Sequence, residues 1–294
     1  MSFSVAVGLA LAVATAFTSV VGFLYKHRGA AESPAVEMSR PLHSTLMLFR
    51  SGWYVIGIAI ATASWGLHVG ALSLAPISLV QSVIAGGLVL LTVTADRLFA
   101  QEVTRREWVG VALAAAGLAF LAATIGGTGH SAHSDYDVVR LAPYVAVAGL
   151  GGLALAATAP PGPRRGPLLG VAAGLLWAAS DTSIKALSGN LGDGVGAVLL
   201  NPLAAVIALA SFAGLLVSAR SLQLGRAVPV IAVTSVAANV VTIAAGPIVF
   251  AEPMPGTAVG VVARVLAFAL VISAAALTPA PVRAAQGPEP VSAS

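Results

Sequence analysis

The segment WAASDTSIKAL, at 177–187, places a carboxylate and an amine inside an otherwise apolar stretch. Asp181 and Lys185 stand four residues apart, a spacing that puts both on one face of a helix. A carboxylate in apolar surroundings can hold a proton or balance the charge of a cationic solute. The lysine side chain is long enough to extend toward the outer end of the helix. An internal ion pair that only stabilises the protein is the alternative interpretation.

A second group of polar residues lies in WGLHVGALSLAPISLVQSVIAGG, at 65–87. His68 and Gln81 flank Pro76, and a proline is tolerated between two helices because its missing N–H is not needed there. A turn at Pro76 would bring the two polar side chains to the same end of neighbouring helices, where they could border a shared cavity. His68 could also carry a proton near neutral pH. Alternatively, His68 lies at the membrane surface and Gln81 bonds to an adjacent helix.

Two further polar residues, Arg264 and Asn239, lie in apolar segments later in the chain. A charge at the centre of a membrane costs at least about 2.5 kcal/mol, so such residues have partners or line a polar cavity. Arg264 could bind an anionic group of a solute or pair with Asp181. Asn239 could hydrogen-bond a solute or a neighbouring helix. The candidate substrate-binding residues are therefore Asp181, Lys185, His68, Gln81, Asn239 and Arg264.

Three other polar residues suit structural roles. Glu102 and Glu252 stand where an apolar segment ends, shortly before the next segment begins. A carboxylate is favourable at the N-terminus of a helix because of the helix dipole, so we expect each glutamate to stabilise the start of the segment that follows it. Asn201 precedes Pro202, and this pair predicts a local break in a helix.

The chain lacks the common motifs of enzymes that use zinc, nucleotides or a serine nucleophile. It contains no HExxH, P-loop or G-x-S-x-G sequence and no cysteine. These motifs position a metal ligand set, a phosphate cradle and an activated hydroxyl, respectively. We therefore expect no enzymatic activity, no cofactor and no metal site. Any uphill movement of a solute must then draw on an ion gradient.

The composition indicates that lipid covers much of the surface. Of the 294 residues, 58% are hydrophobic and 9% are charged, whereas soluble domains carry roughly 25% charged residues. Mean hydropathy is +0.95. The net charge of +4 comes from basic residues that stand singly or in pairs between apolar runs, a pattern that does not form a nucleic-acid-binding patch. We expect an integral membrane protein with no nucleic-acid partner.

Apolar segments of about 20 residues, the length that crosses a bilayer, recur along the chain. They predict an all-α transmembrane bundle with spans at 3–24, 51–73, 76–95, 107–125, 139–158, 167–187, 195–217, 227–250 and 257–278. If the N-terminus lies outside, most lysines and arginines fall in cytoplasmic loops, as is usual for multi-pass proteins of the cell membrane. We therefore expect an outer N-terminus and a cytoplasmic C-terminus.

An internal repeat relates the two halves of the chain. Residues 71–110 align with 221–260 without a gap, and the alignment pairs Glu102 with Glu252, two of the few acidic residues. A single span between the repeats inverts the second one. Inverted repeats are typical of secondary transporters, whose substrate site lies near the middle of the membrane. The predicted units are a four-span repeat at 1–125, a linker with one span at 126–166, an inverted repeat at 167–278 and a disordered cytoplasmic tail at 279–294.

The segments ALSLAPISLVQS and EWVGVALAAAGLAFL resemble those of the drug/metabolite transporter superfamily, in its EamA-like group. The nine-span layout, together with SVVGFLYKHRG and PRRGPLLGVAAGLLWAASDTSIKALSG, is most similar to the NIPA-type branch, which is associated with magnesium. The resemblance implies two inverted repeats and a transport function. The NIPA pattern has a Glu and an Asn before the Ala-Pro pair, where this chain has Trp65 and His68. The carboxylate best suited to attract a divalent cation is therefore missing.

These observations favour a secondary transporter that moves a small polar metabolite or drug-like solute by alternating access. Its partners would be a small-molecule substrate and the lipid bilayer. The sequence is also compatible with a homodimer. A magnesium or divalent-cation transporter of NIPA type is the alternative, although Mg²⁺ usually needs one or two carboxylates and Asp181 is the only deep one. A membrane scaffold without transport activity is the second alternative. The short loops count against it because they expose little surface for docking.

Overall fold

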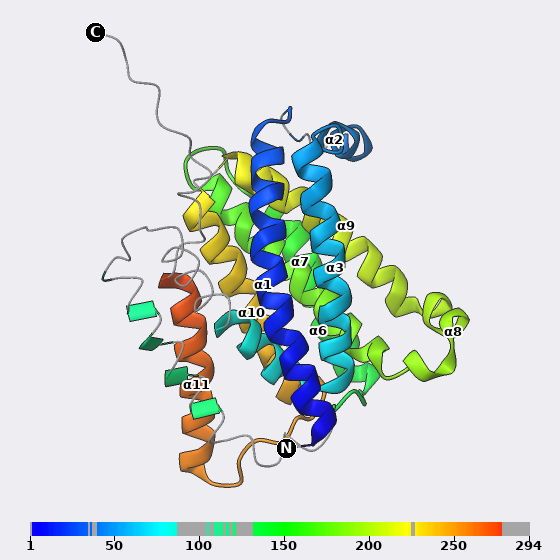
Figure 1. The fold of residues 1–294 in the computed structure, drawn as a ribbon, viewed down its shortest axis with the longest axis vertical. Coiled ribbons are helices and arrows are strands. Elements are labelled where there is room, and N and C mark those ends of the chain that lie inside the picture. Colours follow the sequence, from blue (N-terminus) through cyan, green and yellow to red (C-terminus); the bar gives the residue numbers. More distant parts are fainter. Residues whose placement is uncertain are drawn as a thin grey trace.

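The described part of the chain consists of α-helices that lie side by side (Figure 1). The structure, a computed structural model, describes residues 2–34, 36, 40–86, 105, 109–110, 112–113, 116–117, 120–121, 132–224 and 227–277. No β-strand occurs within these ranges. Glu102, most of the predicted span at 107–125 and the predicted tail at 279–294 lie outside the described residues.

Helices long and apolar enough to cross a membrane are α3 (Gly52–Leu74), α6 (Val138–Thr158), α7 (Arg165–Ser188) and α9 (Pro202–Leu224). Three more long helices, α1 (Phe3–Ala31), α10 (Ala227–Val249) and α11 (Ala258–Leu277), also contain apolar stretches. The remaining elements are α2 (Pro41–Leu48), a helix at Ile77–Gly86, the 3-10 turn η2 (Leu191–Asp193) and α8 (Val195–Leu200). These apolar helices are compatible with a membrane protein. The nine crossings and the inverted repeat stay predictions.

The helix break predicted at Asn201 and Pro202 is confirmed, because α8 ends at Leu200 and α9 begins at Pro202. The single span predicted at 195–217 is therefore two helices, and two predicted boundaries differ from the structure. The Asn201 side chain accepts a hydrogen bond from the Leu203 backbone N–H at 3.0 Å, so it caps the new helix, as asparagine commonly does. The helix predicted to end at residue 24 continues to Ala31, because basic residues are favourable near a helix C-terminus.

Helix α7 lies in the interior of the bundle and packs against α6, α9 and α10. Nearly all of its side chains from Ala178 to Ser188 are buried, unlike those of the other three long apolar helices. Gly174 allows close approach to α10, since a Cβ atom there would lie 2.5 Å from the Thr234 carbonyl oxygen. A helix that is enclosed on most sides can carry polar groups away from lipid.

The predicted turn at Pro76 is present. Helix α3 ends at Leu74, Ala75 has an extended backbone conformation, and the next helix begins at Ile77. Helix α1 packs along α3, and Figure 1 shows the two as neighbouring helices. We refer to α3, the turn at Pro76 and the helix Ile77–Gly86 as the hairpin. Buried apolar side chains from the hairpin, among them Leu72 and Val80, join a core that includes residues of α6, α7 and α10. The hairpin therefore lies against the central helix.

Candidate functional site

Three polar side chains from three helices meet at one place. Gln81, on the helix Ile77–Gly86, donates a hydrogen bond from Nε2 to Oδ2 of Asp181 on α7, at 3.0 Å. His68, on α3, places Nε2 3.3 Å from the other carboxylate oxygen, Oδ1. Three of the six candidate residues are thus joined through Asp181, and we refer to His68, Gln81 and Asp181 as the polar cluster.

The polar cluster keeps unused hydrogen-bonding capacity. The His68 side chain is 10% exposed, yet neither ring nitrogen makes a hydrogen bond within the described part of the chain. Its approach to Asp181 is therefore an electrostatic contact without hydrogen-bond alignment. The Asp181 side chain is half-buried and remains 20% exposed. Buried polar groups are nearly always paired, and an unpaired ring nitrogen beside an accessible carboxylate is a suitable place for a proton or a ligand.

The hairpin and the central helix explain why these residues meet. His68 lies six residues before the end of α3, and Gln81 lies four residues after the start of the next helix, so the turn at Pro76 brings them to a similar level. Helix α7 packs against α3 at the same level. Ala178, about one turn before Asp181 on α7, is fully buried, and its small side chain favours close approach of a neighbouring helix.

Lys185 does not reach the end of the helix as its long side chain led us to expect. It is fully buried, and no ion pair with Asp181 is found among the described residues. Its Nζ donates hydrogen bonds to the carbonyl oxygens of Leu72 at 2.7 Å and Ala75 at 2.8 Å, and to that of Ala132. The last carbonyl groups of a helix lack partners within the helix. Lys185 therefore caps the C-terminus of α3.

Glu252 lies at a helix N-terminus, but the prediction that it would stabilise the helix that follows it in the chain is wrong. Its carboxylate accepts hydrogen bonds from the hydroxyl and the backbone N–H of Ser78, at the start of the helix Ile77–Gly86. Glu252 is 5% exposed, and this burial raises the pKa of its carboxyl group. A carboxylate at this position also interacts favourably with the helix dipole.

Arg264 and Asn239 lie elsewhere, and no contact found among the described residues joins either one to the polar cluster. Arg264, on α11, is 2% exposed and donates from Nη1 to the Pro253 carbonyl oxygen at 2.8 Å. Asn239, on α10, donates from Nδ2 to Oγ of Ser235 at 3.1 Å on the same helix. The interior therefore holds both residues through protein groups, and the predicted pairing of Arg264 with Asp181 is not found.

Several buried hydroxyl groups near Asp181 have partners on their own helix. Thr182 and Ser183 both donate to carbonyl oxygens one turn earlier in α7, at 2.8 Å. Ser82 does the same on the neighbouring helix. Such bonds satisfy the hydroxyl without linking helices. The polar cluster differs because its contacts join three helices. Sequence reasoning missed Ser78, which lies in the first turn of the helix Ile77–Gly86 and donates to Glu252 from its hydroxyl and its backbone N–H.

Comparison of the chain with protein families, with curated proteins and with solved structures finds no match. Within the described ranges, no group of three or more His, Asp or Glu side chains gathers at spacings that could hold a metal ion. The chemistry of the polar cluster must therefore be judged from its own residues. It offers one carboxylate, one imidazole and one amide.

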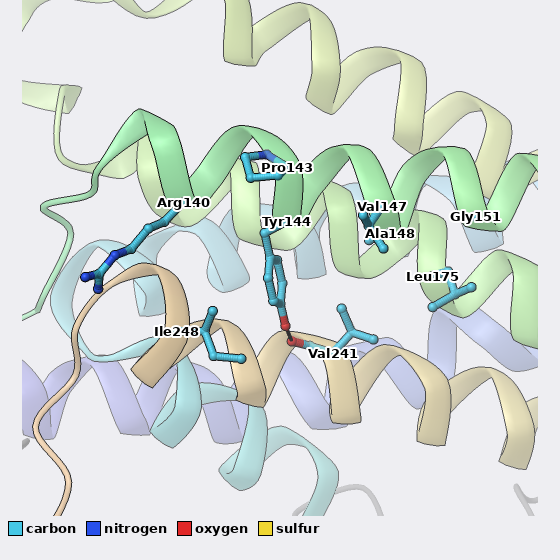
Figure 2. Close-up of a pocket in the computed structure, with 9 residues that line it drawn as sticks. All are labelled: Arg140, Pro143, Tyr144, Val147, Ala148, Gly151, Leu175, Val241 and Ile248. Atoms are coloured by element: carbon cyan, nitrogen blue, oxygen red, sulfur yellow. Dashed lines mark hydrogen bonds between the residues drawn. The ribbon is translucent and has the colours of Figure 1, made fainter.

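The bundle also has open grooves on its surface. One, of about 810 Å³, lies between α6 and α10 (Figure 2). Two others, of about 660 Å³ and 630 Å³, lie beside α9, next to α6 and to α3, respectively. All three have mostly apolar walls, and none of them includes a residue of the polar cluster. The grooves and the polar cluster are thus separate features.

Proposed function

We propose that this protein is a secondary transporter for a small polar solute and that Asp181 is the main solute-binding residue. The observation that supports this most is the polar cluster itself, in which an accessible carboxylate meets an unpaired imidazole inside an apolar bundle. Such intramembrane groups are expensive, and they commonly mark solute or proton pathways. The proposed arrangement is two inverted repeats that move against each other around the cluster.

The charge of the cluster supports a solute with a cationic group. Asp181 contributes one negative charge, and the buried Lys185 is directed to backbone carbonyl oxygens instead. Gln81 contributes a neutral amide. A carboxylate in such surroundings is most stable when a proton or a cation accompanies it. A proton on His68 or the ammonium group of a zwitterionic solute meets this need, and the two would compete for one place.

Uptake by proteoliposomes tests this function. The purified protein would be supplied with radiolabelled amino acids and small amines, and separately with Mg²⁺ and an internal fluorescent indicator. We expect saturable uptake of at least one organic solute, and we expect the Asp181→Asn variant to lose it while keeping its folded yield. Asp193→Asn is the matched control, because Asp193 is exposed and contacts only its neighbour Asn190.

Two results would overturn the proposal. One is the absence of uptake for every solute tested, which would favour a membrane scaffold. The other is uptake that Asp181→Asn leaves unchanged, which would remove the assigned site. Saturable Mg²⁺ influx without organic solute uptake would favour the divalent-cation alternative.

A further inference from the structure

The groove between α6 and α10 is long, apolar and open to the surroundings of the bundle. Figure 2 shows its two walls, with Arg140 at one end and Tyr144 reaching across to Val241. The lining residues are Arg140, Pro143, Tyr144, Val147, Ala148, Gly151, Leu175, Val241 and Ile248. Leu175 belongs to α7, which lies between the two helices and forms the floor.

Small residues on α6 keep the groove open. Gly151 faces it, and a Cβ atom added there would meet no atom within 4 Å. The next residue, Gly152, faces α7 instead, where an added Cβ would lie 2.9 Å from the Ala172 carbonyl oxygen. The Tyr144 hydroxyl donates to the Val241 carbonyl oxygen at 2.6 Å and joins the two walls at one point. Helix α6 thus packs closely against α7 but stays apart from α10.

The lining favours a hydrocarbon chain over a polar solute. Among the described residues that line the groove, the polar side chains are those of Arg140 and Tyr144, and the Tyr144 hydroxyl is already hydrogen-bonded. At the rim, Val147 is 75% exposed and Ile248 is 51% exposed. Exposed apolar surface of this kind is buried favourably against another apolar group. In a membrane protein, the neighbouring apolar groups are lipid acyl chains.

The length and the charge of the groove suggest which lipid it holds. Eleven residues separate Arg140 from Gly151, which is about 16 Å along a helix, or roughly the depth of one leaflet of hydrocarbon. Arg140 lies in the first turn of α6, is exposed and forms no ion pair within the described ranges. The nearby Asp137 side chain accepts a hydrogen bond from the Val139 backbone N–H at 2.9 Å and caps the start of α6. A free guanidinium at the end of the groove is complementary to a phosphate.

We infer that this groove binds one acyl chain of an anionic phospholipid, whose headgroup phosphate contacts Arg140. The lipid bridges α6 and α10, which otherwise have few direct contacts. The assignment requires only that the bundle lies in a membrane and does not depend on transport activity. It differs from general solvation by lipid because it specifies one headgroup charge and one pair of helices.

Lipid titration of delipidated, detergent-purified protein tests the inference. Phosphatidylglycerol, phosphatidylcholine with the same chains, and soluble glycerol phosphate would be added separately. Bound lipid would be counted by native mass spectrometry. We expect one phosphatidylglycerol to bind about fivefold more tightly than phosphatidylcholine, the factor that one basic side chain contributes at an anionic membrane surface. Glycerol phosphate, which has the charge but no chain, should not bind measurably.

Two variants separate the headgroup contact from the chain contact. Arg140→Gln should remove the preference for phosphatidylglycerol while leaving weak binding of both lipids. Gly151→Leu should fill the groove and lower the binding of both. Arg164→Gln and Gly66→Leu are matched controls, because Arg164 is exposed outside the groove and a Cβ atom at Gly66 meets no atom within 4 Å. Both controls should bind as the unaltered protein does.

Equal binding of the two phospholipids by the unaltered protein would overturn the headgroup assignment. Unchanged binding by Gly151→Leu would overturn the location in the groove. Tight binding of glycerol phosphate would show an anion site that needs no chain. Comparable folded yields of Gly151→Leu and Gly66→Leu would establish that lost binding is not caused by misfolding.

Discussion

Lys185 and Glu252 hold the two helix ends of one hairpin. Lys185, from α7, donates to the carbonyl oxygens of Leu72 and Ala75 where α3 ends, and Glu252 accepts from Ser78 where the next helix begins. Both side chains are buried, and the attraction between them lessens the cost of charging either one. The second half of the chain thus holds the hairpin that carries His68 and Gln81. This contact fixes the level at which the hairpin faces Asp181.

Removing the Lys185 amine should destabilise the protein strongly. In Lys185→Met, the buried carbonyl oxygens of Leu72 and Ala75 and the partly buried one of Ala132 lose their donor, and Glu252 loses a nearby positive charge. Removing one partner of a buried ionic contact typically costs about 3 kcal/mol or more. Thermal unfolding in detergent, followed by tryptophan fluorescence, measures the loss.

A double-mutant cycle with Glu252→Gln then tests whether the two residues act together. We expect the double variant to be less destabilised than the sum of the two single variants. In each single variant one ionisable side chain stays buried without its partner, whereas in the double variant both are gone. Arg164→Gln, which removes an exposed charge, is the control. Additive losses would mean that the two residues stabilise the hairpin independently.

The stability of the protein should fall as the pH rises above the ordinary pKa of a glutamic acid. Burial raises the pKa of Glu252 from its ordinary value of 4.5. Below 4.5 the carboxyl is protonated in both states, whereas at higher pH the unfolded chain releases its proton first, so unfolding becomes more favourable until the raised pKa is passed. The charged or polar groups that face Glu252 are Ser78, Lys185 and Arg264.

Unfolding temperatures measured between pH of about 4 and about 8 test this dependence, since the window begins near the ordinary pKa of a glutamic acid. The unaltered protein should lose stability across the window, and Glu252→Gln should lose less. Parallel curves for the two proteins would assign the dependence to another group. Ser78→Ala provides a control that removes a hydrogen bond without removing the titrating group.

Composition and periodicity predicted most of the helices, because apolar segments of membrane length are unambiguous. That His68 and Gln81 lie near each other could also be predicted, because a turn at Pro76 brings the ends of their two helices together. Their contacts with Asp181 were not predicted, although an isolated carboxylate in an apolar segment is expected to face the interior. These inferences depend on local rules.

The partners of Lys185, Arg264 and Glu252 could not be predicted in the same way. Lys185 and Arg264 bind backbone carbonyl oxygens, which every residue has, so the side-chain pattern contains no signal for them. Glu252 caps a helix that lies 174 positions away along the chain. Pairings of this kind depend on how the helices pack, and helical periodicity does not determine packing.

Gly174 should tolerate substitution far less than Gly66, although both belong to GxxxG pairs in the sequence. A Cβ atom at Gly174 would lie 2.5 Å from the Thr234 carbonyl oxygen, and one at Gly66 would meet no atom within 4 Å. Gly174→Ala should therefore separate α7 from α10 and cost about 1–3 kcal/mol, as overpacking typically does. Gly66→Ala should leave the unfolding temperature unchanged or slightly raised. Equal effects would contradict the close packing of α7 and α10.

Gln81 should influence solute handling through its hydrogen bond to Asp181. The bond, at 3.0 Å, orients the carboxylate. A hydrogen bond to a charged group contributes about 1.5 kcal/mol or more, which corresponds to roughly tenfold in an equilibrium constant. Gln81→Leu keeps the size of the side chain but removes the donor. We expect it to raise the KM of uptake by roughly tenfold on that basis.

Ser82→Ala is the matched control for this prediction, because Ser82 is adjacent and equally buried but bonds only to the Ser78 carbonyl oxygen of its own helix. Its uptake should equal that of the unaltered protein. Since Gln81 contacts the carboxylate directly, Gln81→Leu in combination with Asp181→Asn should add no further loss of solute binding. An equal effect of Gln81→Leu with and without the Asp181 carboxylate would show that Gln81 stabilises the hairpin and has no role in binding.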